Sequence, residues 1–512
     1  ATMVYHAQNR SAVRSQKELA NLLSKSHVNH LTTDTIAALA TAPGKSGICV
    51  VRVSGPNSGT VAKQILDFDP TPRTAHLSRF KDENGDIIDE GIALFFKGPA
   101  SFTGEDVLEL QGHGGPSVQK LLLERVLNLD VRLANPGEFS ERAFLNNKID
   151  LVQAEAIADL IDANSAQAAR SAIRTLSGEF SNKVNHLVAE LTKIRVNIEA
   201  AIDFSDEDID IITESRVREG LREITQTLSL ALSQANQGML LKEGMHVVIA
   251  GEPNAGKSSL LNALLGSESA IVTSIAGTTR DLLSERLQIE GMPVHITDTA
   301  GLRRSDDVVE QEGIRRAGEA VRQSDKILLV IDSTAVEITL QQSVKTDEVD
   351  NGHELSLSLI PQLLLDEPGL FAKTLVVFNK ADLTPGASIG AGTVYVPTLL
   401  KEQEGVPATL DTITLSGKLN EGIDGLREAL KEAIGFNSMV EGAFVARERH
   451  LLSLKAARKL IASAEQCFVD AMPFELAAED LRLAQHELGK ITGQISSDDL
   501  LGEIFSNFCV GK

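Results

Sequence analysis

Cysteine is scarce in this sequence of 512 residues, and Cys49, Cys467 and Cys509 lie far apart. Three scattered thiols cannot form a disulfide framework or a zinc site made of clustered cysteines. Their scarcity fits a reducing compartment, where thiols stay reduced. An uninterrupted apolar run of about 18 residues is also missing, which argues against a transmembrane helix.

Positive charge is in deficit, because 49 lysines and arginines face 71 aspartates and glutamates and leave a net charge of −22. Phosphate binding depends on Lys and Arg, so this balance argues against a protein that grips nucleic acid over its whole surface. A local basic site or a basic partner remains compatible with it. The apolar fraction of 42% is ordinary for a globular chain, and the length predicts several domains.

Residues 1–33 differ from the rest, since Arg10, Arg14, Lys17 and Lys25 stand there against one acid. A basic, serine-containing and acid-poor stretch is typical of an organellar transit peptide. Residues added for expression, or a misassigned start, also explain it, and the lack of an initial Met favours them.

The pattern along the chain predicts the further organisation. Residues 34–150 mix apolar strands with helices and form an α/β domain. Residues 151–242 lie in a proline-free stretch with helical spacing. Residues 243–436 alternate strand and helix, the pattern of a parallel sheet wrapped by helices. Residues 437–512 return to helical spacing, so the α/β unit is expected as an insertion into one discontinuous helical domain.

Local patterns predict individual elements. Asn84-Gly85 indicates a hairpin turn, and Pro116 indicates the start of a helix. Apolar positions from Val184 to Ile198 recur at helical spacing. Strands are expected at Ile48–Val53, Ile92–Phe96, Val107–Leu110, Val247–Ala250, Val294–Thr297, Leu375–Phe378 and Ile413–Leu415.

The stretch Gly251–Ser258 fits the phosphate-binding pattern G-x-x-x-x-G-K-[ST] and precedes a predicted helix from Ser259 to Leu265. Its glycines let backbone N–H groups turn inward around phosphate oxygens. Lys257 is expected to reach the β and γ phosphates, and the Ser258 hydroxyl to bind Mg²⁺. The positive end of the helix faces the phosphates.

Two later motifs complete the phosphate side of the site. Asp298-Thr-Ala-Gly301 ends a predicted strand, where Asp298 suits the second shell of Mg²⁺ and the Gly301 N–H suits the γ-phosphate. Thr278-Thr279 precedes it, and a hydroxyl there can complete the Mg²⁺ shell.

Two further motifs concern the base. In Asn379-Lys380-Ala381-Asp382, the Asp382 carboxylate can accept hydrogen bonds from N1–H and the exocyclic amino group of guanine. Adenine offers no such pair of donors, so the predicted base is guanine. Ser416-Gly417-Lys418 is a weaker match to the last loop around the base. The ordered set predicts a GTPase.

Leu302 follows Gly301, where Ras-type GTPases carry a glutamine that orients the attacking water. Leucine cannot orient water, so positive charge and a water holder must come from elsewhere. The side-chain oxygen of Asn254 is a candidate ligand for a monovalent cation. Glu310, near two aspartates, is a candidate water holder or base, or else part of a solvated surface run.

Three features outside the nucleotide motifs are open to two interpretations each. Arg52 ends an apolar run and is either a surface charge or a ligand contact. Gly112-His113-Gly114-Gly115 either holds an anion or simply turns the chain. Cys509 is either a reactive thiol beside a terminal lysine or a small buried apolar residue.

Together these residues resemble one family, the MnmE (TrmE) tRNA-modification GTPases, from about Thr33 to Lys512. The resemblance rests on the nucleotide motifs and on Asp34-Thr-Ile-Ala, Ala42-Pro-Gly44, Phe102-Thr-Gly-Glu-Asp106, Gly112–Gly115, Pro136-Gly-Glu-Phe-Ser-Glu-Arg142 and Cys509-Val-Gly-Lys512. Residues 1–32 have no counterpart in typical bacterial members, and the stretch from Ser333 to Lys373 is longer than usual and has no assignment.

The resemblance implies an N-terminal domain that dimerises and binds a tetrahydrofolate one-carbon donor, either the 5,10-methylene or the 5-formyl form. It implies a GTPase that depends on Mg²⁺ and K⁺. With an FAD-dependent partner (MnmG, or GidA), such homodimers install an aminomethyl-type group on carbon 5 of the wobble uridine of certain tRNAs. The expected location is the bacterial cytoplasm, or the mitochondrial matrix if residues 1–33 are a transit peptide.

Residue roles follow from the same resemblance. Folate contacts are expected from Arg52, Glu109, Lys148 and Lys512. Nucleotide contacts are expected from Asn254, Ala255, Gly256, Lys257, Ser258, Ser259, Thr273, Ser274, Ile275, Ala276, Gly277, Thr278, Thr279, Asp298, Thr299, Ala300, Gly301, Asn379, Lys380, Ala381, Asp382, Ser416, Gly417 and Lys418. Ser258 and Thr279 would hold Mg²⁺, while Asn254, Thr273, Ile275 and Thr278 would hold K⁺. Lys257, Glu310 and Cys509 would be catalytic.

Two other classes of protein compete with this interpretation. A purely regulatory GTPase would need neither the folate-type residues nor the terminal Cys509. A folate-binding module with a vestigial nucleotide domain would not keep Lys257, Ser258 and Asp298 intact.

Overall fold

The computed structural model describes residues 34–163, 165–203, 211–266, 284–289, 292–298, 315, 318–335, 354–384, 388–397, 400, 406–433, 444–470, 472–495, 498–506, 508 and 511. Some side chains within these ranges, that of Asp298 among them, are not described. The chain forms two compact units. The first holds the described residues up to Ala158 together with Thr175–Thr225 and Ala456–Lys512, and the second holds Asp159–Arg174 and Gln226–Lys455.

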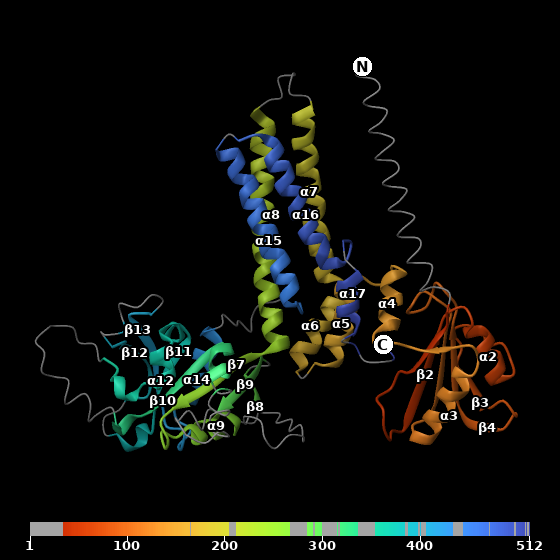
Figure 1. Cartoon of the computed structure of the whole chain (residues 1–512), viewed down its shortest axis with the longest axis horizontal. Coiled ribbons are helices and arrows are strands. Elements are labelled where there is room, and N and C mark those ends of the chain that lie inside the picture. The colour runs from red at the N-terminus through yellow and green to blue at the C-terminus, as the bar shows by residue number, and fades with distance from the viewer. Residues whose placement is uncertain are drawn as a thin grey trace, which may run out of the picture. The chain divides into compact units, whose positions relative to one another are not determined.

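A six-stranded sheet in the order β3-β4-β5-β2-β1-β6 forms the N-terminal part of the first unit (Figure 1). The strands are β1 (Ile36–Leu39), β2 (Ile48–Ser54), β3 (His76–Lys81), β4 (Ile87–Phe96), β5 (Val107–His113) and β6 (Arg132–Leu133). All neighbours are antiparallel except β1 and β6, which run parallel. The predicted hairpin turn at Asn84-Gly85 is confirmed, because it joins β3 to β4 with Gly85 at φ +89°.

One face of this sheet carries α2 (Ser58–Leu66) and α3 (Pro116–Leu127). In β2, Val51 and Val53 are buried against these helices, and they alternate with Arg52. Successive side chains of a strand point to opposite faces, so Arg52 lies on the other face of the sheet. Part of that face is covered by α4 (Glu138–Leu145), whose Phe139 packs on β1.

Long helices follow the sheet domain: α5 (Leu151–Ile161), α6 (Ala166–Leu176), α7 (Glu179–Asp203) and α8 (Ile211–Glu243). The C-terminal part supplies α15 (Glu448–Val469), α16 (Phe474–Thr492) and α17 (Asp498–Ser506). α7 packs against α16, where Arg195 Nη1 donates to Gln485 Oε1 at 2.5 Å. α15 meets α8 through an ion pair between Arg222 and Glu465 at 3.5 Å. The predicted pairing of two separate helical stretches is confirmed.

Between α8 and α15 lies a seven-stranded sheet in the order β12-β13-β11-β10-β7-β9-β8. Its strands are β7 (Met245–Gly251), β8 (Ser284–Ile289), β9 (Met292–Asp298), β10 (Lys326–Asp332), β11 (Thr374–Asn379), β12 (Gly390–Tyr395) and β13 (Thr409–Thr414). The five inner strands are parallel, and only β8 and β12 at the edges run antiparallel. This confirms the predicted insertion of a parallel α/β domain.

Apolar side chains cover both faces of this sheet. One face packs on α9 (Lys257–Leu265) and α14 (Ile423–Ala433). The other face receives α12 (Gln362–Asp366) and the 3₁₀ segment Pro368–Lys373. The described end of the stretch 333–373, which the sequence left without assignment, therefore covers the sheet.

Among the helices that the structure describes, none is both long enough and apolar enough to cross a bilayer.

The turn before α4 generates a stability prediction. Gly137 has a φ of +70°, and a Cβ there would lie 2.5 Å from the backbone oxygen of Phe505 in α17. Gly137→Ala should destabilise this unit by roughly 1–3 kcal/mol, because it adds backbone strain to a steric clash. Differential scanning calorimetry should show the transition of this unit at a lower temperature. The matched control is Gly502→Ala in α17, where a Cβ meets nothing within 4 Å. Equal transitions for both variants would contradict the prediction.

Candidate functional site

The phosphate-type loop between β7 and α9 has a positive φ at three of its positions. Gly251 (φ +142°) and Gly256 (φ +91°) have positive φ, and so does Asn254 (φ +64°). A Cβ on Gly251 would lie 2.1 Å from Val330 O, and one on Gly256 would lie 2.3 Å from Asn379 Nδ2. The loop is therefore pressed against β10 and β11, and glycine is required at both positions.

The helix after this loop points its N-terminus at the space the loop encloses. α9 begins at Lys257, and Ser258 and Ser259 in its first turn are exposed. Lys257 Nζ donates to the carbonyl oxygens of Gly251 and Glu252, each at 2.9 Å. An ammonium group in the first turn of a helix, at the positive end of the helix dipole, suits an anionic ligand such as phosphate.

The remaining nucleotide motifs lie at the same edge of the sheet. Asp298 at the end of β9 is in register with Ile249 of β7, which places its backbone next to the loop. β11 ends in Asn379 and β13 ends in Thr414. β10 pairs in parallel with both β7 and β11, and β11 pairs in parallel with β13, so all these strands end at the same edge. The carboxyl ends of parallel strands form the usual ligand edge of such a sheet.

Polar contacts join the base-type motifs to the phosphate-type loop. Asn379 Nδ2 donates to Ala255 O at 3.0 Å and to Gly256 O at 3.2 Å, and its Oδ1 accepts from Gly417 N at 2.9 Å. Ser416 Oγ donates to Asp382 Oδ1 at 2.6 Å. The buried amide of Asn379 therefore ties three loops together, while Asp382 keeps its second carboxylate oxygen for a ligand.

The base-type motifs contain three further predicted site residues, Lys380, Ala381 and Lys418, which differ in their contacts and burial. Lys380 has a φ of +65° and pairs with Asp332 at 2.7 Å. Ala381 is buried, and its N–H donates to Leu415 O at 3.1 Å. Lys418 is exposed beside Gly417.

Several predicted site residues lie outside the described part of the chain. These are Thr273, Ser274, Ile275, Ala276, Gly277, Thr278, Thr279, Thr299, Ala300, Gly301, Glu310, Cys509 and Lys512. Their roles stay predictions.

A second group of functional residues surrounds Arg52 on the N-terminal sheet. Arg52 of β2 is in register with Glu109 of β5, and its Nε and Nη2 donate to Glu109 Oε1 at 3.0 and 2.9 Å. Both side chains are largely buried, with 24% and 17% exposure. The Arg52 guanidinium lies 6.0 Å from the ring centre of Phe102 and 5.8 Å from that of Phe139. Arg52 is thus held in place, unlike a free surface charge.

Lys148 and the chain terminus approach the same domain. Lys148 Nζ donates to Pro99 O at 2.9 Å and stays exposed, so two of its N–H groups remain for a ligand. Gly511 (φ +96°) lies against β1, since a Cβ there would be 2.4 Å from Leu39 O. The backbone next to Lys512 therefore meets the strand that neighbours β2.

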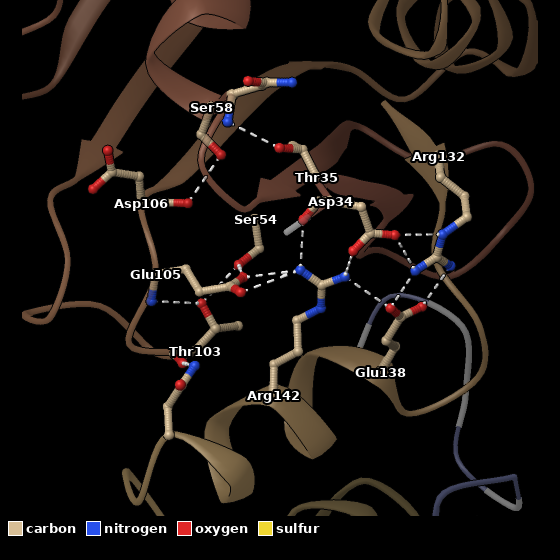
Figure 2. Close-up of polar contacts among 12 residues, drawn as sticks. Asp34, Thr35, Ser54, Ser58, Thr103, Glu105, Asp106, Arg132, Glu138 and Arg142 are labelled. Atoms are coloured by element: carbon tan, nitrogen blue, oxygen red, sulfur yellow. Dashed lines mark hydrogen bonds and ion pairs between the residues drawn. The ribbon is translucent and has the colours of Figure 1, made fainter. Parts of the chain in front are cut away.

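The same domain holds a partly buried ionic cluster centred on Arg142 of α4 (Figure 2). Arg142 Nη1 contacts both Glu105 oxygens at 3.2 Å, and Nη2 donates to Asp34 at 2.6 Å and to Glu138 at 3.0 Å. Arg132 donates to Glu138 at 2.6 and 2.9 Å and to Asp34 at 2.9 Å. Two cations are thus shared among three carboxylates.

The cluster shifts the ionisation of its members. Burial alone would raise the pKa of Glu138, but hydrogen bonds from Arg132, Asn135 N–H and Arg142 together hold this pKa below its usual value. The pKa of Asp34 is lowered in the same way, against burial, by Arg132 and Arg142. For Glu141 the direction is opposite, because burial and the nearby Glu138 charge raise its pKa.

The sequence missed two features of this site. Neither the contacts of Arg52 with Phe102 and Phe139 nor the Glu105–Arg142 pair has a signal in local spacing, because their members are far apart in the chain. The one available signal was that Phe102 and Glu105 belong to one motif quoted for the family resemblance, and Phe139 and Arg142 to another.

The loop Gly112–Gly115 turns the chain into α3, while His113 Nδ1 pairs with Asp89 at 2.8 Å.

Comparison with known proteins gives two matching family models. The model described as "MnmE helical domain" matches residues 151–509, and the model described as "GTP-binding protein TrmE N-terminus" matches residues 35–148.

Full-length relatives are named "tRNA modification GTPase MnmE". The protein of Vibrio cholerae is 51% identical over 94% of this chain and 100% of its own length. That of Histophilus somni is 51% identical over 94% and 100%, and that of Marinobacter nauticus is 50% identical over 94% and 99%. A solved structure, the G domain of the T. maritima FeoB iron transporter, is 25% identical and covers 37% of this chain and 96% of that chain. The TM-score of that structure against this chain is 0.23.

The ionic cluster generates a pH prediction. The pKa of Glu138 is lower in the fold than its unfolded value of 4.5, so its stabilising effect is complete above that value and is lost as the pH falls through the folded pKa. Glu138→Gln should destabilise the first unit by roughly 3 kcal/mol at pH 7, and the difference from wild type should shrink as the pH falls below 4.5 and through the folded pKa. Urea unfolding at several pH values measures this.

The matched control is Glu141→Gln on the same helix. Its raised pKa means that the charged form is disfavoured, so this variant should be at least as stable as wild type at pH 7. An equal loss for Glu138→Gln at pH 3 and pH 7 would show that its charge is not the source of stability.

Proposed function

Because the chain belongs to the family of MnmE tRNA modification GTPases, we propose that it hydrolyses GTP in order to modify carbon 5 of the wobble uridine of certain tRNAs. The GTPase activity and the action on tRNA are those of the family. The proposal adds a tetrahydrofolate one-carbon donor, a flavoprotein partner of the MnmG type and an aminomethyl-type product. One observation carries it: a single chain holds both a nucleotide edge and a second polar site around Arg52.

The residues at the nucleotide edge fit GTP with Mg²⁺. Gly251 and Gly256 are held against β10 and Asn379 in a backbone conformation that favours glycine, and such glycine loops let backbone N–H groups turn toward phosphates. Ser258 is exposed in the first turn of α9, where a hydroxyl can ligate Mg²⁺. Asp382 is oriented by Ser416 and retains an acceptor oxygen for the donor edge of guanine. We propose that Thr279 completes the metal shell and that Asp298 acts from the second shell.

Positive charge for hydrolysis is proposed to come from a bound K⁺. Asn254 is exposed within the phosphate-type loop, so its side-chain oxygen is accessible to a cation. Thr273, Ile275 and Thr278 would supply further oxygen ligands, and Glu310 would hold the attacking water. A monovalent cation here would neutralise charge that develops in the transition state, which Leu302 cannot do.

The group around Arg52 fits the chemistry of a folate. A reduced pterin ring presents N–H and NH₂ donors, and the Glu109 carboxylate can accept hydrogen bonds from them. The second oxygen of Glu109 makes only a weak contact with Gln111 Nε2, at 3.5 Å, so it can still accept from a ligand. The tail of a folate carries carboxylates, and Lys148 has N–H groups for them. We propose that Lys512 adds a further contact from the terminus, which Gly511 brings to β1.

The wider organisation is part of the same proposal. Residues 34–150 form the folate-binding and dimerisation domain, 151–242 and 437–512 form one helical domain, and 243–436 form the G domain. The protein acts as a homodimer in complex with the flavoprotein and tRNA. Cys509 contributes a thiol to the modification chemistry.

Guanine specificity is tested at Asp382. Asp382→Asn should weaken GTP binding and shift preference toward xanthosine triphosphate, because the amide replaces one acceptor with a donor. Competition binding with both nucleotides measures the shift. Asp424→Asn, at a residue of the same domain whose side chain is 95% exposed, is the control and should bind GTP normally. Wild-type GTP affinity in Asp382→Asn would show that this loop does not read the base.

Cation dependence is tested by turnover in KCl and in NaCl at equal ionic strength. Turnover should rise steeply in KCl, and Asn254→Ala should abolish the gain with little change in GTP affinity, because the ion acts on the transition state. Asn420→Ala is the matched control, since Asn420 has a similar φ of +58° in the same domain and carries the same backbone strain. Equal rates of the wild-type protein in the two salts would mean that another group neutralises the charge.

The complete proposal is tested at Arg52. Arg52→Gln should weaken binding of 5-formyltetrahydrofolate to the full-length protein by about tenfold or more, because a buried charge pair is lost. GTP hydrolysis should persist, while mass spectrometry of tRNA from cells with this variant should show less modified wobble uridine. Arg79→Gln, which breaks an exposed pair with Glu90 in the same domain, is the control. Normal modification in cells without the protein would exclude the proposed function.

A further inference from the structure

Two sequence motifs, Phe102–Asp106 and Pro136–Arg142, meet in the structure although neither contains a residue assigned to a ligand above. They meet at two places. Phe102 and Phe139 lie on Arg52, with their ring centres 6.0 and 5.8 Å from its guanidinium. Glu105 and Arg142 form an ion pair at 3.2 Å. The two motifs therefore form one assembly around the Arg52–Glu109 pair.

The two aromatic rings differ in what they offer. Phe139 is fully buried, in contact with β1, and presents no free surface. Phe102 is 38% exposed, although it belongs to a loop that is otherwise firmly held. A large apolar ring left in water beside a largely buried ion pair is a surface on which a planar heterocycle can stack.

The loop that carries Phe102 is anchored by α4 and the turn after it. Asn146 Nδ2 donates to Thr103 O at 2.7 Å, and Lys148 Nζ donates to Pro99 O at 2.9 Å. Arg142 holds the Glu105 carboxylate, which is three residues after Phe102 (Figure 2). The position of the ring is thus set from outside the loop.

Glu105 is the charged link of this anchoring. Its side chain is 11% exposed and that of Arg142 is 2% exposed, so the pair is shielded from water. Ser54 Oγ, 2.7 Å from Thr103 Oγ1, also donates to Glu105 Oε2 at 2.7 Å. Removing the Glu105 charge takes away the ionic contact between this loop and Arg142, which keeps Asp34 and Glu138, so the loop loses its charged anchor.

We propose that Phe102 stacks on the planar ring of the bound folate and that the Glu105–Arg142 pair is a positioning device that holds Phe102 against Arg52. This rests on the proposed folate site. Glu105 acts through Phe102 and does not touch the ligand.

Calorimetric titration of the full-length protein with 5-formyltetrahydrofolate tests the proposal. Phe102→Leu removes the ring but keeps an apolar side chain, and it should raise the Kd about tenfold. Glu105→Gln should raise it by a similar factor. The double variant should bind no more weakly than Phe102→Leu alone, because Glu105 acts through a ring that is already gone. Glu90→Gln, at an exposed pair of the same domain, is the control and should keep the wild-type Kd.

Two results would overturn the proposal. One is a wild-type Kd for Phe102→Leu, and the other is a Kd of the double variant that rises by the product of the two single effects. If Glu105→Gln does not fold, Ser54→Ala removes one hydrogen bond to Glu105 and should weaken binding several-fold, again without further loss in the Phe102→Leu background. Absence of binding to the wild-type protein overturns the proposed folate site itself, and with it this positioning role.

Discussion

The buried guanidinium of Arg142 is the constraint on which the N-terminal domain depends. A charge with 2% exposure requires compensation at close range, and Asp34, Glu105 and Glu138 provide it from three different segments. Those segments are the start of β1, the loop before β5 and the first turn of α4. Because each carboxylate must face the same cation, the three segments cannot move independently. Phe102 and Phe139, the two rings near Arg52, belong to the second and third of these segments.

The nucleotide domain uses a neutral group for the same purpose. The amide of Asn379 donates to the phosphate-type loop and accepts from Gly417, so the loop after β11 is tied to the loops after β7 and β13. An amide has both donors and an acceptor, which a carboxylate or an ammonium group lacks. The Asn379 side chain can therefore bind backbone carbonyl oxygens of one loop and a backbone N–H of another, and it adds no charge next to an anionic ligand.

Local patterns predicted much of the fold because their physical causes are local. The strand at Ile48–Val53, the hairpin turn at Asn84-Gly85 and the helix start at Pro116 all occur as predicted, since β-branched runs, positive φ and a fixed φ act within a few residues. The insertion of the parallel sheet between helices was predicted from the order of patterns alone. The described end of the stretch 333–373 had no such pattern, because its short helical segments are stabilised by packing on the sheet.

For the functional residues, the sequence by itself determined the chemistry, and the tertiary structure decided the geometry. The order of the phosphate-type and base-type motifs was enough to predict a guanine-nucleotide site, because these groups recognise their ligand through residue type and spacing. Sequence could not decide whether Arg52 was a surface charge. That depended on Glu109, Phe102 and Phe139, which reach it only when β5, a loop and α4 fold together. Ion pairs and ring contacts between distant segments leave no periodic signal in a chain, so their existence and strength are set by burial in the folded protein.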